Sequence, residues 1–195
     1  MKYVYNIEEN EESRKKKLLI TYKLMNFSKY IKNSKTHLDF GCGFGTFTYL
    51  LAKKHPKTMF YGIDINEKMI SYAKTKYNLK NLSFNPDKSI KYDSLSFLYV
   101  LHHIEYTQIE LKKILSFLNK KGKVFILEFK KTPKETFWKL YNSGNHSQEF
   151  ELYYNIHNRW SKKEFERMCK SVGLKTLLLK DYGEYWFVYV GEKEK

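Results

Sequence analysis

The chain has 195 residues, of which 42% are hydrophobic and 17% aromatic, and this composition excludes a mainly disordered protein. The length favours a single domain, and two cysteines are too few for a disulfide framework or a cysteine-based zinc site. The formal charge of +15 suggests an acidic partner such as nucleic acid, but among 36 basic residues only Arg14, Arg159 and Arg167 are arginines, the side chains best suited to read bases and grip phosphate.

No secretion signal or membrane span is visible in the sequence. Charged residues occur from Lys2 onward, and the longest largely apolar stretch, residues 95–101, is far shorter than a bilayer requires. We therefore expect a cytoplasmic protein that has no membrane partner.

The N-terminal segment, residues 1–35, has an acidic start and then apolar residues at helical spacing, so we expect a helical lid. From residue 36 to 129, short apolar runs alternate with helical patterns. This alternation predicts an α/β fold with a Rossmann-like, doubly wound and mainly parallel sheet. The expected strands cover residues 36–40, 59–65, 82–84, 94–101 and 124–129.

Polar residues indicate where several helices begin and end. Asn66 can cap the helix after the second strand, and Thr107 and Ser161 each begin a Ser/Thr-x-x-Glu capping box. Gly122 is placed to end the helix that begins at Thr107.

The alternation breaks between residues 130 and 160, a stretch that is rich in aromatic residues and too long for a simple connection. We expect an irregular insertion there, on the substrate side. Residues 161–195 should form a helix followed by a C-terminal antiparallel β-hairpin, with strands over residues 174–180 and 185–190. Together these parts make one domain.

The loop after the first strand carries three glycines, Gly41, Gly43 and Gly45, which allow the backbone to approach a ligand closely. It is not the dinucleotide fingerprint, because Thr46 occupies the position of that motif's third glycine. Asp64, at the end of the second strand, is placed to accept hydrogen bonds from the ribose hydroxyls of a nucleoside. The pattern predicts a site for a nucleoside-containing cofactor.

Five segments follow one another along the chain: LDFGCGFGTFT (38–48), YGIDINEKMISYAK (61–74), YDSLSFLYVLHHI (92–104), LSFLNKKGKVFILEF (115–129) and SKKEFERMCKSVGL (161–174). In this order they resemble the class I S-adenosylmethionine-dependent methyltransferases, in particular the small type 11 group. The resemblance covers roughly residues 30–191. It implies the class I methyltransferase fold, a cofactor-binding core over residues 36–129, S-adenosyl-L-methionine as cofactor and S-adenosyl-L-homocysteine as product.

The cofactor-binding residues that the resemblance implies follow the first four strands. One departure concerns the fourth strand, where Ser94 and Ser96 replace the valine and isoleucine that are usual in the family and so weaken the strand prediction. The implied residues are Asp39, Gly41, Cys42, Gly43 and Gly45 around the methionine part, Asp64 at the ribose, Ile65 and Asp87 at the adenine, and Phe97 and Leu98 at the methionine end.

His102 and His103 follow the fourth strand, with Tyr99 beside them, in the segment expected to lie closest to the reactive methyl group. We interpret them as candidate catalytic residues that either position the methyl acceptor or remove its proton. No carboxylate or cysteine accompanies the two histidines at ligand spacing, so we expect no metal site.

The methyl acceptor is the least determined part of this interpretation. Residues 143–158 contain no lysine or arginine, which favours a small-molecule acceptor. Methylation of RNA or protein by way of the basic surface is the alternative, so nucleic acid is a possible but not a favoured partner. A module that binds the cofactor without transferring its methyl group is disfavoured, because the glycine loop and Asp64 are intact.

Overall fold

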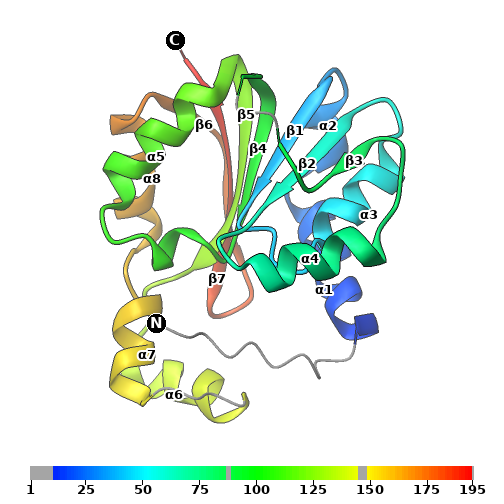
Figure 1. Ribbon diagram of the computed structural model, residues 1–195. Coiled ribbons are helices and arrows are strands. Elements are labelled where there is room, and N and C mark those ends of the chain that lie inside the picture. Colours follow the sequence, from blue (N-terminus) through cyan, green and yellow to red (C-terminus); the bar gives the residue numbers. More distant parts are fainter. Residues whose placement is uncertain (1–10, 87–88, 145–148, 195) are drawn as a thin grey trace.

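A seven-stranded sheet forms the centre of the computed structural model, which describes residues 11–86, 89–144 and 149–194. Its strands are β1 (Thr36–Phe40), β2 (Met59–Ile63), β3 (Leu82–Ser83), β4 (Tyr92–Leu98), β5 (Leu118–Phe129), β6 (Leu174–Tyr182) and β7 (Trp186–Lys193). They lie in the order β3-β2-β1-β4-β5-β7-β6 (Figure 1). Strands β1 to β5 pair in parallel, and β7 is antiparallel to both β5 and β6. The predicted doubly wound, mainly parallel sheet with a C-terminal antiparallel hairpin is confirmed.

Helices cover both faces of this sheet (Figure 1). One side carries α1 (Glu11–Leu24), α2 (Phe27–Ile31), α3 (Thr46–Lys54) and α4 (Glu67–Lys76), and the other carries α5 (Thr107–Ile114) and α8 (Lys162–Ser171). Beyond the carboxyl ends of the parallel strands lie α6 (Lys134–Asn142) and α7 (Phe150–His157), and the short 3-10 helices η1 (Leu101–His103) and η2 (Leu115–Phe117) flank α5. Among the described helices, none combines the length and the apolar character needed to cross a membrane.

Part of the N-terminal segment belongs to the core. Met25, Phe27 and Ile31 are buried, and the ring of Phe27 stacks on that of Phe125 in β5, with centroids 4.0 Å apart. Such aromatic pairs stabilise a fold beyond the apolar area that they bury. From Met25 onward the segment is therefore fixed to the sheet, and the end of α1 also packs on the core, since Thr21 is buried and the Tyr22 hydroxyl bonds Nε2 of His55 at 2.9 Å. A lid role for residues 1–35 stays a prediction.

Strands β4 and β5 differ from the predicted strands at their ends. β4 ends at Leu98 instead of residue 101, because Tyr99 has a φ of +60° and turns the chain out of the sheet. β5 begins at Leu118 instead of residue 124, since η2 ends the preceding helix early and Leu118 pairs with Tyr92. Gly122 therefore lies within β5, and the prediction that it ends a helix is wrong.

Two of the three predicted helix caps are confirmed. The side chain of Asn66 caps α4, and Ser161 forms a capping box at the start of α8. The capping box predicted at Thr107 is wrong, because its hydroxyl instead donates to the carbonyls of Leu101 and Ile104 at distances of 3.3 and 2.6 Å. Thr107 thereby ties the start of α5 to η1.

The insertion over residues 130–160 contains two helices, so the expectation that it is irregular is wrong. Phe137 of α6 is buried against Tyr153 and Tyr154 of α7, with ring centroids 5.8 and 5.3 Å apart. These aromatic side chains pack on one another inside the insertion, and Phe137 also lies beside Phe129 of β5, with ring centroids 6.3 Å apart.

Candidate active site

The glycine loop lies where the connections of the sheet diverge. β1 lies between β2 and β4, and open sheets of this type bind ligands at the carboxyl ends of the strands beside such a switch point. Gly41 has a φ of +72°, and its amide donates to the Ile63 carbonyl at 2.8 Å. A Cβ atom at Gly41 would lie 2.5 Å from Cγ2 of Val100, so only glycine fits between the loop and the segment after β4.

Gly43 has a different environment from Gly41. A Cβ atom placed there would meet only Sδ of Met69 within 4 Å, at 3.9 Å, so the backbone at Gly43 borders open space. Oδ2 of Asp64 accepts the Gly43 amide at 2.8 Å, and Oδ1 accepts the Asn66 amide at the same distance. Asp64 therefore holds the loop against the start of α4, and each of its oxygens keeps a lone pair for a further donor.

The surface beside Asp64 is open to a ligand. A cavity of about 350 Å³ lies there, and Ile65 is 100% exposed next to it. The position predicted to contact adenine is therefore accessible. Asp87, the other residue predicted at the adenine, lies outside the described residues. The cavity is lined by Ile63, Asp64, Glu67, Ile70, Ser71, Lys74 and Phe84.

Cys42 donates its amide to the Ile63 carbonyl at 2.9 Å and its thiol to the Gly43 carbonyl at 3.8 Å. Its half-buried side chain packs against the small cluster formed by Ala73, Tyr77 and Phe84 on the α4 side. Burial raises the pKa of the Cys42 thiol well above its usual range, so the thiol stays protonated. This environment fits a space-filling residue and not a nucleophile.

Asp39 lies beneath the loop, with 2% of its surface exposed. Oδ2 accepts the Thr48 hydroxyl at 2.7 Å, and Oδ1 accepts the Ser96 hydroxyl at 2.5 Å. Burial raises the pKa of Asp39 to about 6, against the opposing effect of these two hydrogen bonds. The structure thus places this carboxylate as a support of the loop, within the interior.

Ser94 and Ser96 explain the departure from the usual strand composition. Ser96 uses its only proton for Asp39, so its oxygen must accept from Nε2 of His37 at 2.9 Å. Nδ1 of His37 then accepts the Ser94 hydroxyl at 2.8 Å. Burial lowers the pKa of His37 to about 3, which keeps the ring neutral as this chain of hydrogen bonds requires. The serines therefore satisfy buried polar groups in the sheet.

The candidate catalytic residues lie directly after the end of β4. The side chain of Phe97 is fully buried and that of Leu98 is half-buried, so Phe97 can offer only backbone atoms to a ligand. Tyr99 donates its amide to the Leu127 carbonyl at 2.9 Å, and its ring lies beside that of Phe129. Its left-handed backbone is uncommon for a bulky residue and is a kind of strain often found at functional sites.

His102 is held by a buried carboxylate that is not among the residues predicted from the sequence. Nδ1 of His102 donates to Oε1 of Glu128 at 2.5 Å, and Glu128 is fully buried in β5. Glu128 also accepts the Phe129 amide at 2.8 Å. In the neutral ring, this arrangement leaves the lone pair on Nε2 of His102.

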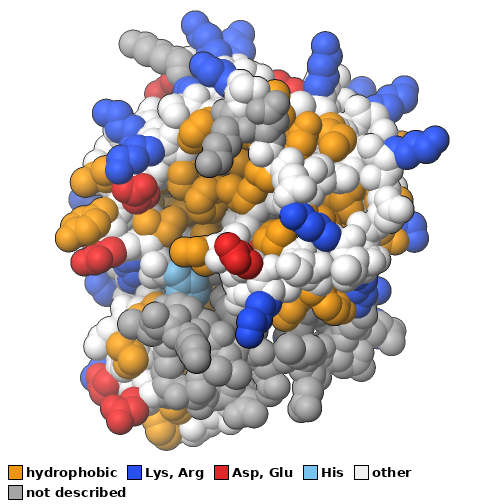
Figure 2. Space-filling view, in the orientation of Figure 1, with side chains coloured by type: hydrophobic (Ala, Val, Ile, Leu, Met, Phe, Trp, Pro, Cys, Tyr) orange, Lys and Arg blue, Asp and Glu red, His pale blue; other side chains and the backbone are white. Residues whose placement is uncertain are grey.

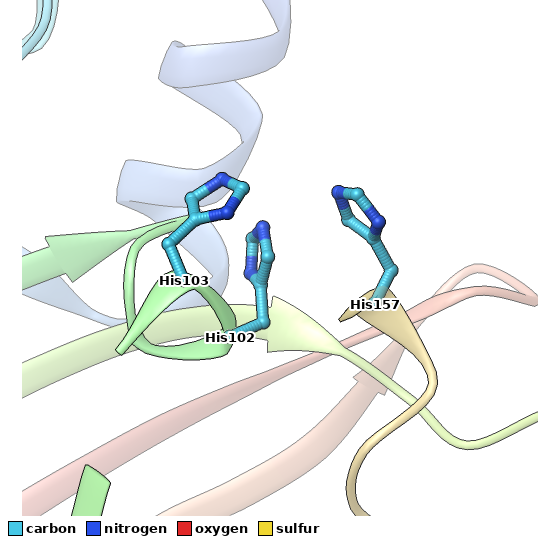
Figure 3. Close-up of side chains that lie close together, drawn as sticks. All are labelled: His102, His103 and His157. Atoms are coloured by element: carbon cyan, nitrogen blue, oxygen red, sulfur yellow. The ribbon is translucent and has the colours of Figure 1, made fainter. Parts of the chain in front are cut away.

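A third histidine, His157 at the end of α7, joins His102 and His103 (Figure 3). Its ring lies 4.5 Å from the ring of His102 and 5.7 Å from that of His103, measured between centroids. His103 is half-buried, and burial together with its neighbour His102 lowers the pKa of His103 to about 3. Residues 130–160 therefore contact the candidate catalytic segment through His157.

Arg159 fixes the backbone around this histidine cluster. Its guanidinium donates to the carbonyls of His102, Ile104 and Glu105 at 3.1, 2.7 and 3.1 Å. It also stacks over the ring of Trp160. In the sequence, Glu128 can be noticed as the single acid within the apolar run VFILEF, whereas nothing nearby indicates the backbone partners of Arg159.

The surface that Figure 2 shows has its hydrophobic side chains in the middle and most of its lysine and arginine side chains around the rim. A histidine side chain is visible between the hydrophobic area and the lower part of the molecule. On this face the basic side chains do not join into one band.

Comparison with known proteins agrees with this fold. A family model described as "Methyltransferase domain" matches residues 12–179. A malonyl-(acyl-carrier protein) O-methyltransferase from Bacillus cereus is 29% identical over 146 residues, which are 68% of this chain and 52% of that protein. The chain therefore spans about half the length of this curated relative.

Two further proteins show how different the acceptors of similar proteins are. A tRNA (guanine-N(7)-)-methyltransferase from Clostridium botulinum is 24% identical over 183 residues, or 78% of this chain and 83% of that protein. The structure of the plantazolicin methyltransferase BpumL, in complex with a monoazolic desmethylPZN analog and SAH, has a TM-score of 0.74 at 16% identity and covers 96% of this chain and 87% of that one. At this identity the likeness concerns the fold.

Proposed function

Since the chain belongs to the methyltransferase domain family, we propose that it binds S-adenosylmethionine at the carboxyl ends of β1, β2 and β4 and methylates a small-molecule acceptor. The observation that carries this proposal is the contact between Asp64 and the Gly43 amide, beside open space at Gly43 and a fully exposed Ile65. S-adenosylhomocysteine would be the product.

The residues around this space fit the parts of the cofactor. The backbone of Gly41, Gly43 and Gly45 would surround the methionine part, supported from below by Asp39. The free lone pairs of Asp64 would accept the ribose hydroxyls, and Ile65 would pack on the adenine ring. When bound, S-adenosylmethionine supplies a methyl group on a positively charged sulfur, already activated for transfer.

The chain's own contribution to catalysis would be alignment, exclusion of water and control of one proton. Tyr99 and His103 would position the acceptor at the end of β4. Nε2 of His102, oriented by Glu128, would take the proton of an acceptor that must lose one. These roles require the acceptor to lie between the segment after β4 and α7.

A small acceptor is supported by the surroundings of this space. α7 and the loop before it contain two acids, Glu149 and Glu151, and no lysine or arginine. A groove that follows a nucleic-acid backbone needs cations along its path. The histidines and aromatic rings of the insertion suit a compact, planar or cationic molecule better.

RNA methylation is the second candidate, and the similarity to the tRNA methyltransferase together with the charge of +15 favours it. The two candidates differ in how binding responds to salt, because each phosphate contact releases counterions. Binding of bulk tRNA that weakens steeply with salt would support the RNA candidate. Absence of tRNA binding at low salt would remove it.

The cofactor proposal is tested by calorimetry with S-adenosylmethionine. Asp64→Ala should weaken binding about 10- to 100-fold, as the loss of charge-assisted hydrogen bonds implies. Glu110→Ala is the matched control, because this carboxylate lies at the surface of α5, where it pairs with Lys113. Unchanged affinity in Asp64→Ala would contradict the assignment.

The acceptor class is tested with cofactor carrying a labelled methyl group in a lysate of the source cells. We expect enzyme-dependent label in the small-molecule fraction. Label that appears only in RNA or in protein would contradict a small acceptor while leaving the cofactor site intact.

A further inference from the structure

The three histidines of the cluster form an arrangement that the proposed methyl transfer does not require. One side-chain nitrogen from each of His102, His103 and His157 lies within 4.8 Å of the other two. Figure 3 shows the rings converging on a shared space, two from η1 and one from the end of α7. The sequence offered only the adjacent pair, and the fold supplies the third imidazole.

In two of these rings, Nδ1 donates a hydrogen bond to a neighbouring group of the protein. Nδ1 of His102 donates to the Glu128 carboxylate at 2.5 Å, and Nδ1 of His157 donates to the Tyr153 carbonyl at 2.7 Å. Histidines that bind metals almost always donate their second nitrogen to a carboxylate or a backbone carbonyl in this way. Both contacts leave the lone pair on Nε2, the nitrogen that would bind an ion.

The spacing is compatible with a metal after a small movement of the rings. Nitrogens 4.8 Å apart would each lie about 2.8 Å from a central ion, whereas zinc–nitrogen bonds are about 2.0–2.1 Å long. Each ring therefore needs to move inward by less than about 1 Å. Since η1 is a single 3-10 turn and His157 is the last residue of α7, no long element has to shift.

We infer that His102, His103 and His157 form a binding site for a divalent transition-metal ion of the zinc type. Imidazole is a preferred ligand of zinc, copper, nickel and cobalt ions, and three histidines leave one coordination position for water or for an oxygen or sulfur of another molecule. The site lies at the carboxyl end of β4, next to the proposed acceptor space.

The charges around the site are consistent with a cation. Glu128 supplies a buried negative charge directly behind His102. Arg159, two positions after His157 in the sequence, has its guanidinium directed at the backbone carbonyls of Leu101, His102, Ile104 and Glu105. A nitrogen that holds a metal cannot accept a proton at the same time. His102 would therefore not act as the proposed base while the metal is bound. The metal site is tested by metal binding and spectroscopy, readouts that do not depend on whether the chain transfers a methyl group.

The test uses the whole chain after removal of metals with a chelator. We expect one equivalent of Co²⁺ to produce the visible absorption of a low-coordinate cobalt site, Zn²⁺ to displace it, and Zn²⁺ to raise the melting temperature of the wild type. His157→Phe keeps an aromatic ring on Tyr153 and should abolish the cobalt spectrum. Glu128→Gln retains all three ligands and should weaken Co²⁺ binding about 10- to 100-fold.

His55→Gln is the matched control, because His55 lies at the end of α3, away from the cluster. This variant should bind Co²⁺ as tightly as the wild type does. The inference is overturned if the wild type binds no stoichiometric Co²⁺ or Zn²⁺. It is equally overturned if His157→Phe binds the metal as tightly as the wild type. Should His157→Phe fail to fold, the wild-type titration and Glu128→Gln decide the question.

Discussion

The hydroxyl of Ser96 in β4 donates a 2.5 Å hydrogen bond to the carboxylate of Asp39 in β1, inside the sheet and directly beneath the glycine loop. The same oxygen accepts Nε2 of His37, whose Nδ1 in turn accepts the Ser94 hydroxyl. Because both oxygens of Asp39 have hydroxyl donors, a nearly inaccessible carboxylate is satisfied without contact with solvent. The strand that carries the proposed catalytic residues is thus tied to the strand that carries the proposed cofactor loop.

Ser96→Ala should destabilise the protein by about 1–3 kcal/mol, because the substitution leaves both Asp39 and His37 with an unsatisfied buried group. Urea denaturation followed by circular dichroism measures this change. Ser116→Ala is the control, since this exposed hydroxyl donates only to a carbonyl one turn away and its loss should change stability by less than about 0.5 kcal/mol. Equal stability of the two variants would show that the chain of hydrogen bonds contributes nothing.

Asp39 and His37 give opposite pH dependences. Burial raises the pKa of Asp39 from 3.8 to about 6, so its contribution to stability is full below pH 3.8 and is lost as the pH rises through about 6. Burial lowers the pKa of His37 from 6.5 to about 3, so its contribution is present above pH 6.5 and is lost as the pH falls toward 3. The two contributions oppose each other between about pH 4 and 6.

Asp39→Asn should therefore change the slope of stability against pH. The free energy of unfolding of the variant minus that of the wild type should increase from pH 4 to pH 6, by up to about 1.4 kcal/mol per pH unit. This slope corresponds to one proton that only the wild type binds on folding. Urea denaturation at several pH values in this range measures the slope. Glu110→Gln removes an exposed carboxylate and should give a profile parallel to the wild type, and a parallel profile for Asp39→Asn would disprove the assignment.

Gly41→Ala and Gly43→Ala should separate the two roles of the loop. Both residues have a positive φ, +72° and +54°, so each alanine costs about 1–2 kcal/mol of backbone strain. Gly41→Ala also collides with Val100 at 2.5 Å and should be the less stable variant by at least about 1 kcal/mol. Gly43→Ala should lose more affinity for S-adenosylmethionine than its stability loss explains, because its new methyl group enters the open space.

The measurements are thermal denaturation for stability and calorimetry for cofactor affinity. Val100→Ala combined with Gly41→Ala should recover part of the lost stability, since it removes the colliding methyl groups. If Gly41→Ala and Gly43→Ala proved equally stable, the close packing of the loop on Val100 would be wrong.

Arg159→Ala should loosen the backbone around His102 and His103. The substitution removes a donor from the carbonyls of Leu101, His102, Ile104 and Glu105, and only those of Leu101 and Ile104 keep the Thr107 hydroxyl. The turn is then less constrained, so the amides of His103 and Ile104 should exchange with solvent faster. Hydrogen exchange with mass spectrometry measures this. Arg167→Ala, which removes an exposed arginine of α8, should leave that exchange unchanged. Unaltered exchange in Arg159→Ala would show that the guanidinium is not what holds η1.

The features that the sequence by itself determined rest on local signals. The alternation of apolar runs and helices predicted the succession of strands along the chain and their mainly parallel direction. The glycine loop and Asp64 indicated a nucleoside cofactor, and Asn66 and Ser161 correctly predicted two helix caps. Each of these signals lies within a few residues of the structure that it specifies. The propensity for a strand, a cap or a tight turn is therefore readable from the chain alone.

Only the tertiary structure decided which distant side chains meet. Asp39 and Ser96, which are hydrogen-bonded, lie 57 positions apart in the sequence, and His102 and Glu128 lie 26 positions apart. His157 joins the cluster because α7 docks against η1. Periodicity shows which face of an element is buried but not which partner covers it. The support of the cofactor loop and the three-histidine site follow from the packing of β1, β4, β5 and α7, because a buried polar group requires a partner that only the complete fold can bring near.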